Sequence, residues 1–127
     1  MKVLKFISTA AVALSFAAAP AFAEETAGEF NGKPIMLASP SGLAASKLLI
    51  DVAKANGRIV AVGEFGHVVY SEDNGITWQQ AERVETQVTL TSVVFPSEEI
   101  GYAVGHDSII IKTEDGGKNW RLVHEDF

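Results

Sequence analysis

The chain has 127 residues, with 10 Lys and Arg against 16 Asp and Glu, a formal net charge of −6 and no cysteine. This length fits at most one small domain, and the lack of cysteine excludes a disulfide framework and any thiolate metal site. The acidic balance argues against a nucleic-acid-binding protein, because phosphate contacts need clustered lysine and arginine side chains.

The first 23 residues have the pattern of a signal peptide. Two lysines precede an apolar run, Phe6–Ala19, and small residues after it predict cleavage between Ala23 and Glu24. The alternative, an uncleaved membrane anchor, is disfavoured because a spanning helix needs ~20 apolar residues. Cleavage removes two lysines, which changes the net charge from −6 to −8. The mature chain is expected in a periplasm or outside the cell, with no membrane span and no lipid anchor.

Residues 24–47 are expected to be a lead-in to the domain. The acidic, glycine-containing segment Glu24–Gly32 is expected to be mobile. The remainder mixes apolar residues with serine, proline and glycine, and it allows one strand near Ile35–Ala38.

Residues 48–127 contain an internal repeat. Ser71–Trp78 returns as Thr113–Trp120, at an offset of 42 residues. Three further matches share this offset without a gap: Ala61–Gly63 with Ala103–Gly105, Leu48 with Leu90, and Val52 with Val94. A repeat of about 40–45 residues is typical of four-stranded propeller blades. The sequence therefore predicts a first blade at 48–85 and a second at 90–127.

Each repeat is expected to form four short strands, because segments rich in β-branched and aromatic residues alternate with turn signals. The strands are expected at Leu48–Ala53, Arg58–Val62, His67–Ser71 and Thr77–Ala81, and again at Leu90–Phe95, Tyr102–Val104, Ser108–Thr113 and Asn119–His124. The predicted fold is therefore all-β: two four-stranded antiparallel blades that form a partial β-propeller.

The repeated motif, Ser/Thr-x-Asp-x-Gly-x-x-Trp, is an Asp box, and each of its residue types has a physical role in a hairpin. The carboxylate can accept hydrogen bonds from its own turn, and the hydroxyl can hold the same loop. Glycine supplies a positive φ, and the indole packs the turn onto the sheet. The residues are Ser71, Asp73, Gly75, Trp78, Thr113, Asp115, Gly117 and Trp120. We assign them a structural role and not a catalytic one.

Together with the segments 48–53, 60–63, 101–106 and 112–120, these boxes resemble the repeats of the photosystem II stability/assembly factor-like propeller family. Asp boxes also occur in sialidases and other bacterial neuraminidase repeat (BNR) proteins. The resemblance covers residues 48–127, and it implies a scaffold for protein partners without a catalytic centre or cofactor. It further implies that the partner is a membrane complex, which in a photosynthetic source is photosystem II.

Two blades cannot close a propeller ring, so blade faces and strand edges are expected to stay exposed. Three explanations are open: a truncated gene product, a homo-oligomer that completes the ring, or a partner that supplies the missing blades. We favour truncation, in which case the chain could be a remnant without activity.

Partner binding is expected on the loops between second and third strands and on the connection Glu82–Thr89, which share one rim of a propeller. The candidate residues are Glu64, Phe65, His106 and Asp107.

The rival function, a sialidase or BNR-type glycosidase fragment, needs an arginine cluster, whereas the chain contains only Arg58, Arg83 and Arg121. The irregular spacing of His67, His106 and His124 gives no metal motif, so no catalytic, cofactor or metal site is expected.

Overall fold

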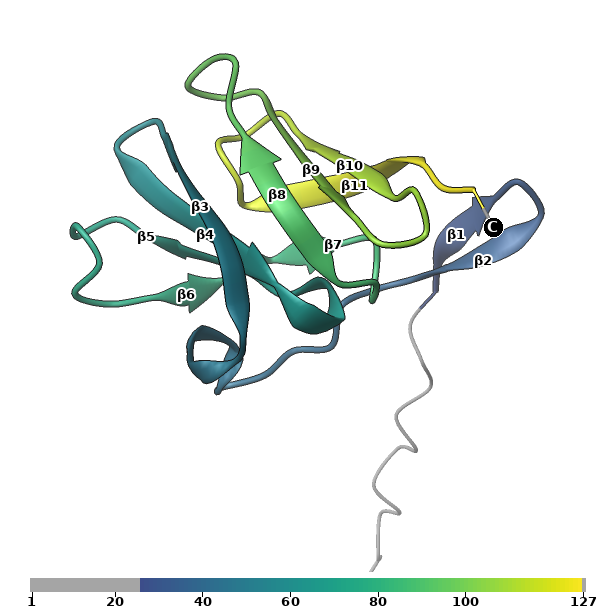
Figure 1. Cartoon of the computed structure of the whole chain (residues 1–127), viewed down its shortest axis with the longest axis horizontal. Helices are drawn as coiled ribbons and strands as arrows, with labels where there is room; N and C mark the ends of the chain where they lie inside the picture. Colours follow the sequence, from purple (N-terminus) through teal and green to yellow (C-terminus); the bar gives the residue numbers. More distant parts are fainter. Residues whose placement is uncertain (1–25, 127) are drawn as a thin grey trace, which may run out of the picture.

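The computed structural model describes residues 26–126, and the predicted signal peptide with its cleavage site lies outside this range. Nearly all regular structure within it is β-strand, arranged in three sheets. Figure 1 shows the two larger sheets side by side and a small hairpin beyond the second of them. The prediction of an all-β chain with two blades of a partial β-propeller is confirmed. None of the helices in the described range is long and apolar enough to cross a membrane.

Each blade is an antiparallel sheet whose four strands follow one another in chain order. The first blade contains β3 (Leu49–Ala55), β4 (Arg58–Gly63), β5 (Val68–Ser71) and β6 (Gln79–Gln80). The second contains β8 (Leu90–Val94), β9 (Gly101–Gly105), β10 (Ile110–Thr113) and β11 (Asn119–His124). These strands overlap the segments expected from the sequence.

The connection between the blades contains one more strand. β7 (Arg83–Val84) pairs in parallel with β11 and becomes the outermost strand of the second sheet. Val84 and Thr86 are only 2% and 4% exposed. The segment expected to form a rim loop is therefore partly interior, because its backbone completes a sheet.

Cross-strand rows of side chains define two faces of each blade, because residues opposite one another in an antiparallel pair point to the same side. We call the face turned toward the preceding part of the chain the N-side face, and the opposite one the C-side face. The N-side rows are Val52–Ala61–Val69–Gln80 and Val93–Ala103–Ile111–Leu122. The C-side rows are Ala53–Val60–Tyr70–Gln79 and Asp51–Val62–Val68 in the first blade, and Val94–Tyr102–Lys112–Arg121 and Ser92–Val104–Ile110–His124 in the second.

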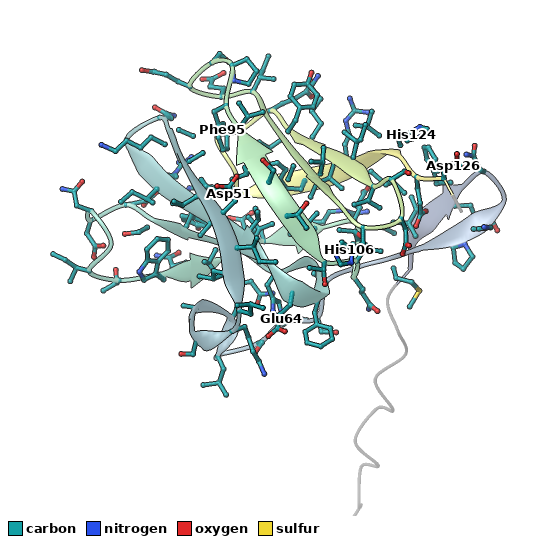
Figure 2. The ribbon with its side chains drawn as sticks, viewed as in Figure 1. Asp51, Glu64, Phe95, His106, His124 and Asp126 are labelled. Atoms are coloured by element: carbon teal, nitrogen blue, oxygen red, sulfur yellow. The ribbon has the colours of Figure 1, made fainter. Side chains whose placement is uncertain are left out.

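The main hydrophobic core lies between the blades, where the C-side face of the first meets the N-side face of the second. Val60 and Val62 are fully buried there, and Ile111 packs in the same cluster. Asp51 lies between the inner strands of the two blades (Figure 2), where its Oδ2 accepts hydrogen bonds from Val93 N at 2.8 Å and from Ser92 Oγ at 3.1 Å. The backbone N–H of Val93 is the main reason that the pKa of Asp51 lies below its ordinary value.

The two repeats do not follow one gap-free offset. Val52 pairs with Ala61, and Val93 pairs with Ala103. Val52 therefore corresponds to Val93, at an offset of 41, whereas the other strands keep an offset of 42. The gap-free match of Val52 with Val94 is therefore wrong by one residue in the first strand. The cause is the first turn: β3 and β4 are joined by the two residues Asn56-Gly57, whereas β8 and β9 are joined by a longer loop. A shift of one residue exchanges the two faces of a strand.

The lead-in contains more regular structure than expected. Within the segment expected to be mobile, β1 (Thr26–Phe30) forms a strand that pairs with β2 (Lys33–Met36), near the expected strand. The hairpin forms here because it has apolar side chains to bury: Phe30 and Ile35 pack against the main core.

Residues 37–47 lie across the N-side face of the first blade, and we call them the strap. The 3-10 helix η1 (Ala44–Ser46) packs on the buried row of that face. The Gln80 side chain holds the strap at two points: it accepts a hydrogen bond from Ser41 N at 2.8 Å and donates one to Ser39 O at 3.0 Å. The strap thus covers the first blade as the first blade covers the second.

Candidate functional site

The first Asp-box turn is held by hydrogen bonds among its own residues. Asp73 Oδ1 accepts hydrogen bonds from Thr77 N and Ser71 Oγ, both at 2.8 Å. Ser71 Oγ accepts one from Gly75 N at 2.7 Å, and Trp78 Nε1 donates to Gly75 O at 3.1 Å. The structure therefore brings the four predicted residues of this box together.

The second Asp-box turn repeats this arrangement. Asp115 Oδ1 accepts hydrogen bonds from Asn119 N at 3.0 Å and Thr113 Oγ1 at 2.8 Å. Thr113 Oγ1 accepts one from Gly117 N at 3.0 Å, and Trp120 Nε1 donates to Gly117 O at 2.8 Å. Gly117 has a φ of 100°, and its counterpart Gly75 has 88°, a region that a Cβ would penalise.

These hydrogen bonds keep both carboxylates ionised. The hydrogen bonds from Thr77, first through its side chain and then through its backbone, lower the pKa of Asp73 to about 2. Burial acts to raise the pKa of Asp115, but hydrogen bonds from Asn119 and Thr113 outweigh it, and the pKa lies below its ordinary value. Each carboxylate is bound to its own turn, so the two do not form a pair that could act on one substrate.

The two tryptophans differ in their surroundings. Trp120 is 1% exposed and meets the Phe95 ring edge-on, with centroids 5.9 Å apart, whereas Trp78 is only half-buried. The difference follows from their place in the fold. Trp120 lies on the side of the second blade that is covered by the first blade, whereas Trp78 lies beside the smaller strap.

Arg58 links the blades at the Asp-box end. Its Nε binds Glu72 Oε1 at 2.7 Å, and its Nη1 donates to the carbonyls of Asp115 and Gly116 at 3.0 and 3.3 Å. The guanidinium also lies 5.8 Å from the centre of the Tyr70 ring. These contacts commit Arg58 to holding the second Asp box against the first blade.

The predicted rim residues lie at the opposite end of the blades from Phe95, where Figure 2 shows Glu64 and His106. Glu64 begins the 3-10 turn η2 (Glu64–Gly66), and its Oε1 accepts a hydrogen bond from Leu48 N at 3.2 Å. The two loops are tied to the chain in the same way: Glu64 N donates to Leu48 O, and His106 N to Thr89 O, each at 3.1 Å.

The middle residue of each rim loop has an unusual backbone. Phe65 and Asp107 hold equivalent positions, with φ values of 55° and 54°. This left-handed region is uncommon for residues other than glycine, especially for a bulky one. Phe65 is nevertheless 60% exposed. Strained residues of this kind cluster at functional sites in proteins.

Other ionisable residues are dispersed. Arg83 pairs with Glu85 at 3.0 Å, on the second blade, and is not part of the Arg58 cluster. No three His, Asp or Glu side chains within residues 26–126 are grouped as metal ligands. His67 is 4% exposed, and its burial lowers its pKa.

Sequence reasoning missed the strap and the role of Gln80. A signal was present, because Gln80 stands where the second repeat has the apolar Leu122. Arg58 similarly stands where the second repeat has Ile100. Departures of this kind from an internal repeat mark positions where the two blades face different neighbours.

Known proteins resemble this chain over most of its two blades. Residues 42–112 match the family model described as photosynthesis system II assembly factor YCF48. No curated protein matches the sequence. The solved structure of YCF48 from Cyanidioschyzon merolae aligns with a TM-score of 0.52 and 24% identity, over 61% of this chain and 24% of that one.

A second structure, described as YCF48 bound to D1 peptide, aligns with a TM-score of 0.53 and 26% identity, over 61% of this chain and 26% of that one. This chain therefore spans about a quarter of the length of the solved structures that it resembles.

Proposed function

The chain belongs to the photosynthesis system II assembly factor YCF48 family, and we propose that it is an exported, non-enzymatic scaffold that binds a protein segment of a membrane complex. The match to the family over residues 42–112, which cover the first blade and part of the second, carries this proposal. In a photosynthetic source the partner is a photosystem II subunit, since a similar protein is described as bound to D1 peptide. In another bacterium the partner is a complex of the cell envelope.

We place the binding surface on the rim loops. Phe65 offers an exposed aromatic ring on a strained backbone, and Glu64 and Asp107 supply carboxylates in the two loops. Glu64 is partly buried and Asp107 is exposed. Loops that present carboxylates and an aromatic ring favour cationic and apolar side chains of a partner. Binding of this kind weakens with salt, because exposed charges are screened.

A pull-down from solubilised membranes tests the partner, and binding of synthetic peptides from the captured subunit tests the surface. The double variant Glu64→Gln, Asp107→Asn removes both charges, and asparagine tolerates the left-handed backbone at 107. We expect it to weaken binding by about tenfold, the loss of roughly 1.4 kcal/mol. The matched control is Glu98→Gln, Glu99→Gln, which removes two exposed carboxylates from the loop at the opposite end. Equal weakening by both double variants would place the surface elsewhere.

The non-enzymatic role is supported by the hydrogen bonds that already engage the candidate catalytic groups. Both Asp-box carboxylates are engaged in their turns, and Arg58 is bound by Glu72 and by two backbone carbonyls. A glycosidase of the sialidase type would need these groups to converge on one sugar. Turnover of a fluorogenic sialoside by the purified protein would contradict this part of the proposal.

The proposal that the protein is exported rests on the signal-peptide pattern of the first 23 residues. We expect the protein in the periplasmic or extracellular fraction with Glu24 as its first residue. Mass spectrometry of the intact protein from that fraction measures this directly. A protein that retains Met1 and stays in the cytoplasmic fraction would show that this part is wrong.

A further inference from the structure

His67 is an ionisable side chain at a position that the other repeat fills with an apolar one. It is 4% exposed, and Ile109, its equivalent in the second repeat, is 1% exposed. The two residues close the same turn: His67 N donates to Glu64 O at 3.0 Å, and Ile109 N donates to His106 O at 3.1 Å. Since the second blade forms this turn without an imidazole, the turn itself does not require a histidine.

The His67 ring lies where the strap and the first rim loop meet. One ring nitrogen is hydrogen-bonded to the backbone of Ser39 in the strap. The Phe65 ring of the rim loop lies edge-on to the imidazole, with centroids 6.2 Å apart. The other ring nitrogen, Nδ1, is buried and has no hydrogen-bond partner within residues 26–126. A change in this ring therefore affects the contacts of both segments.

Protonation changes what the ring needs from its surroundings. A neutral imidazole carries one donor and one acceptor, whereas the charged ring carries two donors. Because Nδ1 is enclosed, the second N–H of a charged ring would have no acceptor, and burying an unpaired charged donor is costly. The closed arrangement therefore favours the neutral form of His67.

The groups around the ring also favour its neutral form on balance. Burial is the largest influence, and it lowers the pKa of His67 below its ordinary value of 6.5. Two charged groups face the ring from the segments packed against it. Glu64, at the start of the rim loop, favours the charged form, and Lys47, at the end of the strap, disfavours it.

The direction of the pH dependence follows from the lowered pKa. If the strap leaves the blade, water reaches the ring and His67 regains its ordinary pKa of 6.5. The stabilisation of the closed form is therefore complete above pH 6.5 and is lost as the pH falls through the lower pKa of the closed form. The Gln80 amide and the hydrogen bond from Ala38 N to Val84 O also hold the strap, but they contain no ionisable group.

We propose that His67 is a pH-dependent switch for the strap and the first rim loop. The neutral ring keeps both segments closed on the first blade, and a proton on Nδ1 shifts both toward an open form. Opening uncovers Ala61 and Val69, which are 4% and 1% exposed under the strap. The second blade has no such switch, because Ile109 cannot take up a proton. This switch is independent of which partner the rim loops bind.

Hydrogen–deuterium exchange of the whole protein, measured by mass spectrometry at about pH 7.5 and about pH 5, tests the switch. After correction for the intrinsic effect of pH on amide exchange, the protection of each segment reports its opening. For the wild type we expect protection of residues 37–47 and 64–67 to fall severalfold, and by at most about tenfold per pH unit, the limit for one proton. Protection within the second blade should stay unchanged.

Two variants separate His67 from other ionisable groups. His67→Ile, which introduces the residue of the second repeat, should leave the strap equally protected at both pH values. His106→Gln removes an exposed histidine from the second rim loop and should respond as the wild type does. Loss of strap protection in His67→Ile at the lower pH would assign the response to another group and overturn the proposal. A wild-type strap whose protection does not change would overturn it as well.

An NMR titration of the imidazole signals in the wild type provides a test that needs no variant to fold. His67 should take up its proton over the same pH range in which the strap loses protection. A His67 ring that stays neutral throughout this range would overturn the proposal. Loss of protection in both blades together would do the same, because it would show unfolding of the whole chain and not opening of the strap.

Discussion

At the scale of single residues, the two Asp-box carboxylates show how a small side chain can hold a turn. Each accepts two or more hydrogen bonds from residues within four positions, and each hydroxyl partner bonds both the carboxylate and a glycine N–H. The charge is therefore part of the folded structure, and stability must depend on its ionisation.

The sign of that dependence follows from the lowered pKa values. The pKa of Asp73 falls from 3.8 to about 2 on folding, so the stabilisation is complete above pH 3.8 and is lost as the pH falls through about 2. We expect the melting temperature to drop in this acid range, and to drop less for Asp73→Asn, which should already be less stable at neutral pH. Thermal melts of both proteins between neutral and acid pH measure this.

Glu98→Gln is the control for this prediction, since it removes an exposed carboxylate outside the turns. It should follow the wild-type curve. If Asp73→Asn also follows the wild-type curve, the carboxylate does not hold the turn as the hydrogen bonds indicate.

At the scale of elements, the Gln80 side chain makes two of the hydrogen bonds that hold the strap. Replacing Gln80 with leucine removes both hydrogen bonds to the strap, and each such bond contributes about 0.5–1.5 kcal/mol. We expect Gln80→Leu to leave the blades folded but to speed proteolytic cleavage within residues 37–47. Mass spectrometry of a limited digest locates the cuts.

Gln79→Leu is the matched control on the same strand. Gln79 accepts a hydrogen bond from the Tyr70 hydroxyl at 3.1 Å and makes no hydrogen bond to the strap. Faster cleavage in both variants would mean that β6 as a whole, and not the Gln80 amide, secures the strap.

The sequence predicted the elements that depend on local chemistry. Strand segments and both Asp-box turns follow from β-branched runs, Asp and Gly, whose effects act within a few residues. The register of β3 could not be predicted in this way, because it depends on a difference in length between two loops. The partner of β7 and the strap's position depend on contacts between segments far apart in the chain. The sequence alone shows that Gln80 and Leu122 differ at equivalent positions of the repeat. It does not show which face of the blade each residue lies on, so the contact of Gln80 with the strap could not be predicted.

At the scale of the whole molecule, the two blades share one core. Fourteen buried residues from both blades and their connection form a single cluster, and Arg58 adds hydrogen bonds across the Asp-box end. Neither blade keeps its buried surface if the other unfolds. A shared core of this kind favours a single unfolding transition.

The two tryptophans report on this cooperativity, one from each blade. We expect Trp78→Phe, which leaves the buried Trp120, to show bluer emission and weaker acrylamide quenching than Trp120→Phe, which leaves the half-buried Trp78. In each variant the fluorescence and circular dichroism transitions should coincide. Trp120→Phe should be the less stable variant, because removing buried aromatic atoms leaves a cavity. Separate transitions from the two probes would show that the blades unfold independently.

The strap also restricts where a further copy of the repeat could be inserted into the chain. A new copy of the repeat inserted before β3 would have to displace a segment that already satisfies Gln80 and covers the buried row beside it. Insertion of a further blade at this position would therefore require the strap to leave the first blade.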